Sequence, residues 1–237
     1  MKIFLSPSDQ TGNLYTGLND VCEADVCRQI AQECFNYLRS RSDIACKLSL
    51  ADTYQERTAQ SNAWGADVHV CIHTNAGGGD GTVVFCYPGN EENAWVKGIY
   101  DAISRISPGN DDGIRSITSL YEINRTTAIC VYLEIEFHDS ASGAKWLRDH
   151  VSYIGETLAD AIIELAGGKQ VWYKVVVDAT DENDAKLQYD DFDHFYVTYN
   201  GNAYFQVGAY RDAGNANTML ATMIAHGYNA SILRQEV

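Results

Sequence analysis

The sequence has few basic residues, and this deficit limits the partners that the protein can have. It contains 17 Lys and Arg against 32 Asp and Glu, which gives a formal net charge of -15 at pH 7. A protein with this charge repels the phosphate backbone of nucleic acids unless it carries a local basic patch. The sequence contains no such patch. We therefore expect no nucleic-acid partner.

Long apolar runs are also missing. No stretch approaches the roughly 20 apolar residues that a helix needs to span a bilayer, so membrane insertion is not expected. The N-terminus, MKIFLSPSDQ, becomes polar soon after its first residues and lacks the apolar core of a signal peptide. We predict that the protein is first located in the cytoplasm.

The seven cysteines form no CxxC pair, and all lie in the first 130 residues. Their odd number and the lack of a secretion signal argue against a disulfide framework, so we predict reduced and mostly buried thiols. There is also no GxSxG motif, and no cysteine has a clear histidine partner. A hydrolase with a serine or cysteine nucleophile therefore has little support.

Strand-like and helical patterns alternate through the first 166 residues. Apolar runs predict strands at 2–5, 44–50, 67–73, 82–87 and 129–137, and helical spacing predicts helices at 20–38, 55–66, 91–106 and 141–166. Such alternation is typical of an α/β fold with a mostly parallel central sheet flanked by helices.

The pattern changes at residues 166–170, where a helix ends in Ala-Gly-Gly-Lys-Gln. The following segment is richer in Tyr, Asp and Asn. It contains strand-like runs at 171–179, 194–199, 202–210 and 229–233 and a helical pattern at 215–228. We predict a first domain at 1–166, a linker at 167–170 and a small α+β domain at 171–237.

Three predicted strands of the first domain end in polar segments: LSPSDQ, CIHTNAGGG and LEIEFHD. Functional groups of α/β proteins gather at the carboxyl ends of strands. Together with Glu23, at the start of the first helix, these segments offer carboxylates and an imidazole. Open catalytic zinc sites use such ligands with a water in the remaining position, although the spacing here forms no compact local motif.

The segments SNAWGADVHVCIHTNA (61–76) and YLEIEFHD (132–139), with Glu23, resemble the zinc-dependent N-acetylmuramoyl-L-alanine amidases, a group that includes many phage endolysins. The resemblance covers roughly residues 1–166. It implies an α/β fold and one zinc ion held by two His and one Glu. It also implies cleavage of the amide between the lactyl group of N-acetylmuramic acid and L-alanine of the stem peptide.

By this resemblance Glu23 is the zinc glutamate, His73 the second zinc histidine and Glu134 the catalytic acid/base. The first zinc histidine does not carry over, because the family motif Asp-Pro-Gly-His is replaced here by Ser6–Asp9. Asp9 lies at the histidine position and can ligate zinc through oxygen, so we predict a site of Asp9, Glu23 and His73. Two carboxylates would favour zinc less strongly over manganese or magnesium.

Four neighbouring residues are candidates for substrate binding: Asn75, Arg115, Glu136 and His138. Each has an alternative. Asn75 could instead hold its loop, and His138 could be structural. Arg115 could pair with stem-peptide carboxylates or lie on the surface. Glu136 shares a strand face with Glu134 and could be a second acid, a substitute ligand, or a solvated or Arg-paired carboxylate.

Two further features lie near the predicted site. His69 shares a strand face with His73, but four residues along a strand span about 13 Å, so both cannot reach one metal. We predict that His69 is packed or hydrogen-bonded. The glycine-rich segment 77–81 lacks the residues of a phosphate-binding loop, and we predict a mobile loop beside the site.

Residues 204–233, YFQVGAYRDAGNANTMLATMIAHGYNASIL, resemble SPOR domains, which bind the glycan strands of peptidoglycan. The resemblance implies a four-stranded antiparallel sheet with helices on one face. Tyr204, Phe205 and Tyr210 are candidates for stacking on sugars. Because side chains alternate along a strand, about half of such aromatics should lie in the core.

Together these features predict a peptidoglycan hydrolase with bacterial peptidoglycan as its partner. With no signal peptide, it resembles a phage endolysin that stays in the cytoplasm until release and then acts at the bacterial cell wall. The alternative form of such a hydrolase is a host autolysin that is exported by another route. The rival hypothesis, from a different class, is a non-catalytic peptidoglycan-binding protein whose metal site degenerated with the loss of the first histidine.

Overall fold

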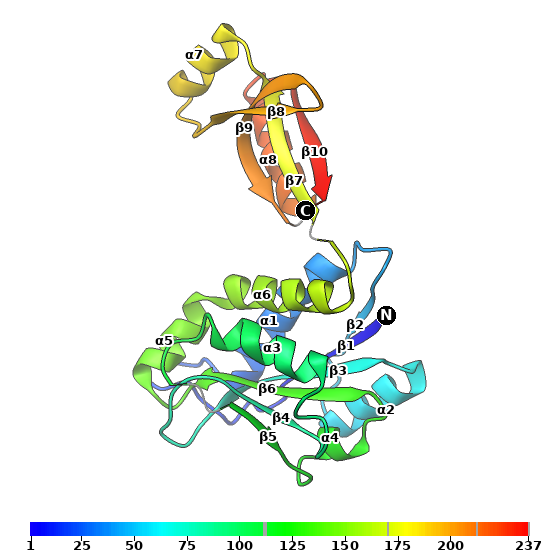
Figure 1. Ribbon diagram of the computed structural model, residues 1–237. Helices are drawn as coiled ribbons and strands as arrows, with labels where there is room; N and C mark the ends of the chain where they lie inside the picture. The colour runs from blue at the N-terminus through cyan, green and yellow to red at the C-terminus, as the bar shows by residue number, and fades with distance from the viewer. Residues whose placement is uncertain (111–112, 170, 212, 237) are drawn as a thin grey trace. The chain divides into compact units, whose positions relative to one another are not determined.

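The computed structural model describes residues 1–110, 113–169, 171–211 and 213–236. They form two compact units, Met1–Gly168 and Lys169–Val237, and Figure 1 shows their elements. The division falls within the predicted linker, of which Gln170 lies outside the described residues. Each unit is described by itself.

The first unit contains a six-stranded sheet. Its strands are β1 (Lys2–Pro7), β2 (Ala45–Leu48), β3 (Val68–Asn75), β4 (Val83–Cys86), β5 (Gly113–Ser116) and β6 (Ile129–Phe137), in the order β2-β1-β3-β6-β4-β5. All neighbouring pairs are parallel except β4 and β6. The predicted α/β fold with a mostly parallel sheet is confirmed.

Helices cover both faces of this sheet. The larger core lies under α1 (Glu23–Leu38), α3 (Ala94–Ser104) and α6 (Val151–Leu165), whereas α2 (Tyr54–Trp64) and α4 (Tyr121–Arg125) lie on the other face (Figure 1). The remaining helix, α5 (Ala141–Asp149), follows β6. The helical pattern over 141–166, which fits one or two helices, forms two, and they meet at His150.

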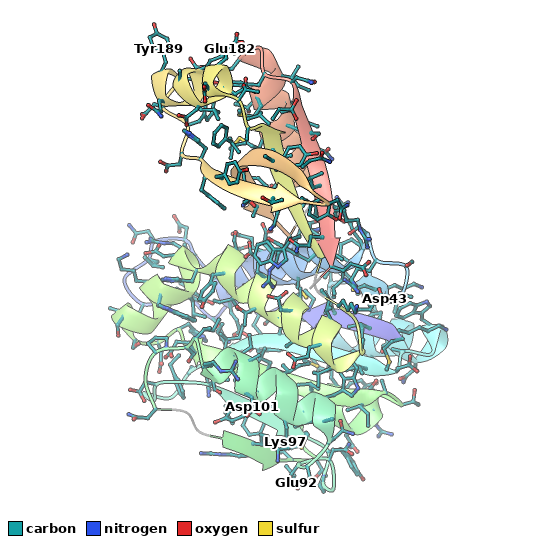
Figure 2. All side chains as sticks on the ribbon, turned by 45° about the horizontal axis from the view of Figure 1, so that its top comes forward. Asp43, Glu92, Lys97, Asp101, Glu182 and Tyr189 are labelled. Carbon is teal, nitrogen blue, oxygen red and sulfur yellow. The ribbon has the colours of Figure 1, made fainter. Side chains whose placement is uncertain are left out.

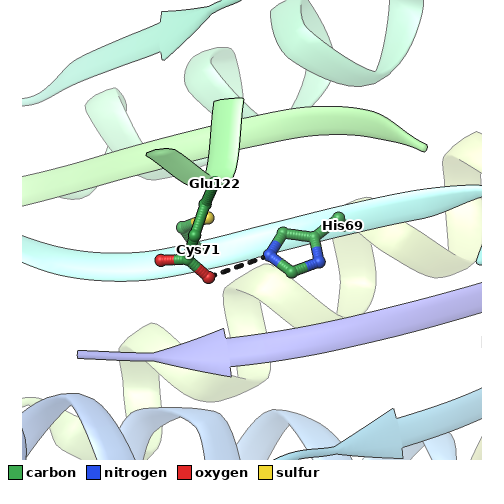
Figure 3. A group of neighbouring side chains, drawn as sticks. All are labelled: His69, Cys71 and Glu122. Atoms are coloured by element: carbon green, nitrogen blue, oxygen red, sulfur yellow. Dashed lines mark hydrogen bonds and ion pairs between the residues drawn. The ribbon is translucent and has the colours of Figure 1, made fainter. Parts of the chain in front are cut away.

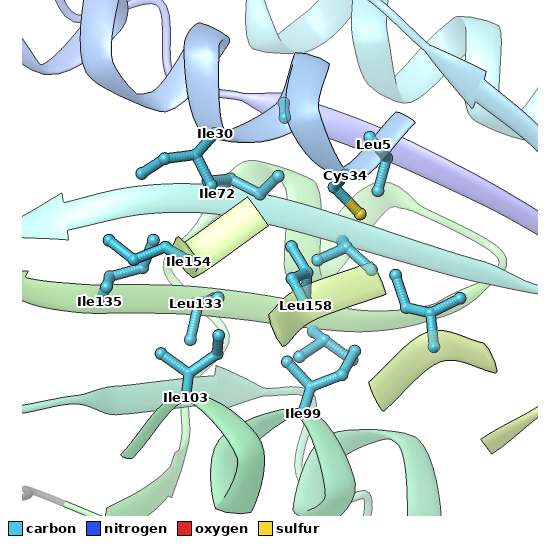
Figure 4. Packing of buried hydrophobic residues seen from close by; sticks show 14 of the residues in the cluster. Leu5, Ile30, Cys34, Ile72, Ile99, Ile103, Leu133, Ile135, Ile154 and Leu158 are labelled. Carbon is cyan, nitrogen blue, oxygen red and sulfur yellow. The ribbon is translucent and has the colours of Figure 1, made fainter. Parts of the chain in front are cut away.

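Alternation along the central strands determines which side chains are available for chemistry. The core beneath α1, α3 and α6 contains the side chains of Ile72 from β3 and of Leu133 and Ile135 from β6 (Figure 4). Successive side chains of a strand point to opposite faces. His73 and Glu134 therefore point to the opposite face, away from the main core.

Local signals account for the ends of α2. The Thr53 hydroxyl accepts a hydrogen bond from the backbone N–H of Glu56, which caps the start of the helix. Gly65 has a φ of 68°, a left-handed conformation that glycine adopts at low cost, and it ends the helix as the sequence predicted. The short elements β5 and α4 were not predicted, because each has only four or five residues and little periodicity.

The cysteines agree with the prediction of reduced, mostly buried thiols. All seven are free, and all except the partly exposed Cys46 are buried. Among the described residues, no helix combines the length and the apolar character needed to cross a membrane.

The second unit is built from β7 (Val171–Asp178), α7 (Asp181–Tyr189), β8 (Phe195–Tyr199), β9 (Asn202–Tyr210), α8 (Ala213–Ala225) and β10 (Ala230–Glu236). Its strands form an antiparallel sheet in the order β10-β7-β9-β8. Its core is a separate cluster of Val175, Val177, Leu187, Ala216, Met223 and Tyr228.

Acidic side chains lie on the surface of both units. Figure 2 labels Asp43, Glu92 and Asp101 on the first unit and Glu182 on α7 of the second, and all four are exposed. Lys97 pairs with Glu92 at 2.9 Å. Exposed ion pairs of this kind contribute little to stability. The acidic surface therefore mainly affects solubility and association with other molecules.

Candidate active site

The carboxyl ends of β3 and β6 place His73 and Glu134 side by side. The two residues are register partners in the parallel pair, and the register becomes irregular directly after His73. The irregularity marks the point where β3 leaves the regular ladder. An imidazole and a carboxylate thus meet at the end of the sheet, on the face opposite the main core.

Glu23 joins this pair from the first turn of α1. Its side chain is buried, and Oε1 lies 2.8 Å from Nδ1 of His73. Asn13 Nδ2 donates to the other carboxylate oxygen at 2.7 Å. Burial raises the pKa of Glu23, but the hydrogen bond and charge of His73 outweigh it and the pKa is lowered. The carboxylate is therefore held in its charged form.

His73 is fixed from several sides. Its ring stacks on Tyr132, with centroids 4.4 Å apart. Burial lowers the pKa of His73, whereas the carboxylates of Glu23 and Glu134 raise it, and the net result is above the ordinary value. Its Nε2 atom is buried with no hydrogen-bond partner in the described part of the chain. The ring is therefore held in place, and its Nε2 atom can still form a further bond.

Glu134 combines partial exposure with a buried oxygen. The residue as a whole is half-buried, but its Oε2 has no hydrogen-bond partner among the described residues. Burial raises the pKa of Glu134 to about 7; the His73 charge lowers it and the Glu23 charge raises it. A carboxyl group with this pKa can both accept and return a proton near neutral pH.

A cavity of about 350 Å³ opens beside His73. Its walls come from the loop after β1, from α2, from the segment around α4 and from β6, and the lining residues are Asp9, Gln10, Tyr54, His73, Ser119, Leu120, Tyr121, Glu122 and Tyr132. Tyr54 and Tyr121 are about two-fifths exposed, with ring centroids 5.4 Å apart. The cavity offers both apolar rings and polar groups to a ligand.

Asp9 lines this cavity but forms an ion pair with Arg57, whose Nη2 lies 3.5 Å from its carboxylate. Asp9, Glu23 and His73 do not bring their ligand atoms within 4.8 Å of one another. The next residue, Gln10, lies closer, with Nε2 3.4 Å from Nδ1 of His73. Gln10 was not among the residues predicted from the sequence, although it directly follows Asp9, which aligns with the first zinc histidine of the family.

A different group of three meets the 4.8 Å criterion in the described part of the chain: His69, Cys71 and Glu122, all buried (Figure 3). His69 Nε2 lies 3.1 Å from Glu122 Oε1, and its ring stacks on Phe4. His69 is therefore packed and hydrogen-bonded, as the sequence predicted, and separate from the His73 centre.

The surroundings of Glu122 argue against a cation in this second group. Glu122 Oε1 already accepts a hydrogen bond from Ser6 at 2.5 Å, and Nη2 of Arg57 lies 3.8 Å from Oε2. Burial raises the pKa of the Cys71 thiol well above its ordinary value, which keeps it protonated. A metal ligand must be a thiolate, so the group is better described as a neutralised buried network.

Glu136 differs from the predicted solvated or Arg-paired carboxylate. It is 1% exposed, and its oxygens accept hydrogen bonds from the backbone N–H of Gly81 at 3.0 Å and of Phe137 at 2.8 Å. Asp139 similarly accepts from Gly77 and Gly78. These two carboxylates hold the backbone of the glycine-rich segment 77–81 at both ends. Substrate binding by Glu136 itself stays a prediction.

The other three substrate-binding candidates have different surroundings. Asn75 ends β3 and bonds to the backbone N–H of Ala76 through its side chain. His138 is buried, stacked on Tyr15 and bonded to Thr74, which is a structural environment. Arg115 lies exposed on β5 and is not among the residues that line the cavity.

In the second unit, two of the three candidate aromatics pack inward. Phe205 and Tyr210 contact the core cluster of that unit, whereas Tyr204 is a register partner of Val197 on the opposite sheet face. Phe195 and Tyr196 of β8 are more exposed, at 58% and 63%. Inward packing disfavours Phe205 and Tyr210 as surfaces for sugar stacking.

The centre at His73 suits a divalent cation. In a tetrahedral site with bonds of about 2.0–2.1 Å, donor atoms lie roughly 3.3 Å apart. The His73 Nδ1 atom lies 2.8 Å from Glu23 Oε1 and 3.4 Å from the Gln10 amide. These residues therefore fit a metal such as zinc.

Known proteins share this architecture. A family model described as N-acetylmuramoyl-L-alanine amidase matches residues 8–164. The N-acetylmuramoyl-L-alanine amidase CwlM of Bacillus licheniformis is 26% identical over 249 residues, which cover 100% of this chain and 86% of CwlM.

Two solved structures show the same fold. The catalytic domain of CwlV, an N-acetylmuramoyl-L-alanine amidase from Bacillus (Paenibacillus) polymyxa, has a TM-score of 0.61 at 22% identity and covers 71% of this chain and 100% of that domain. The catalytic domain of an endolysin targeting Clostridia difficile has a TM-score of 0.55 at 18% identity and covers 69% of this chain and 97% of that domain. By its family match, which spans most of the first unit, the chain belongs to the N-acetylmuramoyl-L-alanine amidase family.

Proposed function

We propose that the protein is a metal-dependent peptidoglycan amidase that cleaves the bond between N-acetylmuramic acid and L-alanine of the stem peptide. Family membership supports the amidase activity. The main support for the mechanism is the position of Glu134. It pairs in register with His73, which bonds to Glu23, and its buried Oε2 has no hydrogen-bond partner among the described residues.

Glu23 and His73 are the residues that would hold the cation. Their positions are fixed before any ligand binds, by Asn13 on the carboxylate and by Tyr132 against the imidazole. When bound there, zinc or a similar ion polarises the scissile carbonyl and acidifies water. Such preorganisation avoids moving the protein groups during the reaction.

Glu134 is the group that moves protons. It takes a proton from the attacking water and returns it to the amide nitrogen as L-alanine departs, in a general acid/base role. A pKa of about 7 in the metal-free protein means that neither form of the carboxyl group is strongly favoured at neutral pH. Its partial exposure leaves a path for substrate.

The cavity beside His73 is the proposed position of the substrate. Tyr54 and Tyr121 present ring faces at its rim, which can pack against a sugar ring or an apolar part of the peptide. Polar side chains of Gln10 and Ser119 also line the cavity and can form hydrogen bonds with hydroxyl and amide groups of the substrate.

The substitution Glu134→Gln tests this mechanism. It keeps the shape of the side chain but removes the titrating group. We expect the rate of stem-peptide release to fall about 100-fold or more, within the range of general acid/base contributions, while zinc binding is retained. The matched control is Glu164→Gln on the exposed side of α6. Wild-type activity in Glu134→Gln would overturn the proposed role, and a wild type that neither binds zinc nor releases stem peptides would favour the non-catalytic hypothesis.

For the second unit we propose a SPOR-like role in binding the glycan strands of peptidoglycan. Its β-α-β-β-α-β order and four-stranded antiparallel sheet agree with the resemblance over residues 204–233. The exposed Phe195 shares with Tyr204 the sheet face opposite Phe205, and these two aromatics are the proposed sugar contacts. Replacing Phe195 and Tyr204 with Ala should reduce co-sedimentation with purified walls; unchanged binding would contradict these contacts.

We further propose that the protein acts as an endolysin, which accumulates in the cytoplasm and reaches the wall after the membrane is permeabilised. The chain shares its fold with an endolysin catalytic domain and equally with the catalytic domain of CwlV, so the behaviour in cells has to separate an endolysin from a host autolysin. Expression in the bacterial cytoplasm should leave cells intact until a membrane-permeabilising agent is added. Lysis without the agent would contradict the proposal.

A further inference from the structure

The residue that completes the metal site is the open question of this active centre. We infer that the side-chain oxygen of Gln10, and not the Asp9 carboxylate, is the third protein ligand beside Glu23 and His73. This inference rests on the proposed metal dependence.

Asp9 is committed to a different partner. It pairs with Arg57, which is 1% exposed and is held through Nε by Ser6 at 2.8 Å and through Nη1 by the carbonyl of Ala51 at 3.0 Å. If Asp9 turned to the metal, Arg57 Nη2 would keep only Glu122, at 3.8 Å. Removing a partner from a buried charge is costly, so the ion pair opposes metal binding by Asp9.

Gln10 is tied to the metal centre by its backbone and its side chain. Its carbonyl accepts a hydrogen bond from the backbone N–H of Ala24, the residue after Glu23, at 3.4 Å. Its amide N–H donates to Ser8 Oγ at 3.2 Å. These bonds anchor Gln10 next to the start of α1. Its side chain is exposed, so the terminal amide can turn.

The contacts of His73 indicate how the amide should be oriented. Nδ1 lies 2.8 Å from Glu23 Oε1 and 3.4 Å from Gln10 Nε2. A ring nitrogen cannot donate to the carboxylate and accept from the amide at the same time. If the amide is turned so that Oε1 faces His73, three lone pairs converge on one point, and a cation there relieves the conflict.

This turn has a small and identifiable cost. Gln10 Oε1 now accepts a hydrogen bond from Asn13 Nδ2 at 2.9 Å, and the turn breaks it. Asn13 retains its bond to Glu23 at 2.7 Å, so the carboxylate stays in place. The resulting ligand set is one imidazole, one carboxylate and one neutral amide oxygen, which is a weaker donor than a histidine nitrogen.

The test compares metal affinity in four full-length proteins: the wild type, Gln10→Ala, Gln10→His and Asp9→Asn. Metal-free protein is titrated with Zn²⁺ against a chromophoric chelator, and the visible absorption of Co²⁺ reports the ligand field directly. Circular dichroism and thermal melting verify that each variant folds. None of these measurements depends on catalysis.

We expect Gln10→Ala to weaken Zn²⁺ binding at least about tenfold, since even outer partners of a metal site contribute 10–100-fold. Gln10→His should tighten binding and shift the Co²⁺ spectrum, because a nitrogen replaces an oxygen donor. Asp9→Asn should leave the affinity within about threefold of wild type. A change of spectrum in Gln10→His is not expected from a residue that only supports the fold.

Two results would overturn the inference: wild-type affinity in Gln10→Ala, or a greater loss in Asp9→Asn than in Gln10→Ala. If the wild type binds neither metal, the inference also fails. In that case the amidase function is judged separately by stem-peptide release. Release of stem peptides without bound metal would support the amidase function alone. A protein that neither binds metal nor releases stem peptides would overturn both the amidase function and the role of Gln10.

Discussion

Glu134 lies beside two charged side chains, yet one of its oxygens has no hydrogen-bond donor within reach in the described residues. A buried carboxylate oxygen without a donor is costly, and such a cost is common at functional sites. Glu122 shows the contrast, because Ser6, His69 and Arg57 all surround it. The two glutamates thus have opposite pKa shifts, and only Glu134 is suited to proton transfer.

The network around Glu122 predicts a specific dependence of stability on pH. Burial raises the pKa of Glu122, but His69, Ser6 and Arg57 outweigh it, so the pKa lies below its ordinary value of 4.5. A lowered pKa contributes stability above pH 4.5, and this contribution is lost as the pH falls through the folded-state value. Glu122→Gln should therefore lower the free energy of unfolding by about 1.5–3 kcal/mol at pH 7.

Urea denaturation of the wild type and Glu122→Gln at pH 7 and at a series of values below pH 4.5 measures this effect. The difference between the two proteins should shrink as the pH falls through the folded-state pKa, because the wild type then also loses the charge. Glu56→Gln, on the exposed side of α2, is the control and should change little. A difference that stays constant with pH would show that the charge of Glu122 is not what stabilises the network.

Part of the site could be predicted from the sequence. His73, Glu23 and Glu134 were predicted from the family resemblance, which is most specific around His73 and Glu134, and the structure places the three side chains close together. Gln10 was missed because a glutamine has no special signal beside an acidic residue. The partners of Glu136 were also missed, since its bonds go to the backbone of a loop, which leaves no pattern in side-chain types.

At the scale of elements, one close approach of two helices depends on a glycine. Gly155 of α6 is packed so tightly against α1 that an added Cβ would lie 2.5 Å from Glu33 Cβ and 2.8 Å from the carbonyl oxygen of Ile30. Real Cβ atoms do not approach backbone this closely, so the helices would have to separate.

Gly155→Ala should therefore destabilise the protein, although alanine favours a helix by about 1 kcal/mol. Overpacking costs typically about 1–3 kcal/mol, so after the gain in helix propensity we expect a net loss of up to about 2 kcal/mol. Ser152→Ala, on the exposed side of the same helix, is the control for propensity alone. Thermal melting of both variants measures the effect. Increased stability in Gly155→Ala would show that α1 and α6 separate easily.

The glycine-rich loop gives a second prediction at this scale. Asp139 accepts hydrogen bonds from Gly77 at 2.7 Å and Gly78 at 2.9 Å. The segment is thus held, although its composition predicted a mobile loop. Asp139→Ala should speed hydrogen exchange at these amides and lower amidase activity several-fold, whereas Asp101→Ala on α3 should do neither. Unchanged exchange in Asp139→Ala would show that other contacts hold the loop.

The sequence predicted long elements better than short ones. The apolar run of β6 and the helical spacing of α2 predicted both elements with nearly correct bounds, because both patterns are strong. The elements β5 and α4 have no period of their own, and neighbouring structure determines them. Yet α4 carries Glu122 and Tyr121, so the missed element forms one wall of the cavity.

At the scale of the molecule, each unit has its own core and its own sheet. A protein that ends at Gly168 should therefore fold and hydrolyse a soluble muramyl-peptide at the wild-type rate. Its lysis of intact walls should be slower, because linkage raises the effective concentration of enzyme at an insoluble substrate. Equal loss on both substrates, with a normal melting temperature, would contradict this division of labour.

The most direct test of the account is the identification of the bond that the protein cleaves. Purified peptidoglycan is digested with the full-length protein in the presence of Zn²⁺, and the soluble products are analysed by mass spectrometry after labelling of free amines. We predict stem peptides with a free L-alanine amino group, glycan strands without new reducing ends, and loss of both products in Glu134→Gln. New reducing sugar ends, or no release of peptides by a zinc-loaded and folded protein, would contradict it.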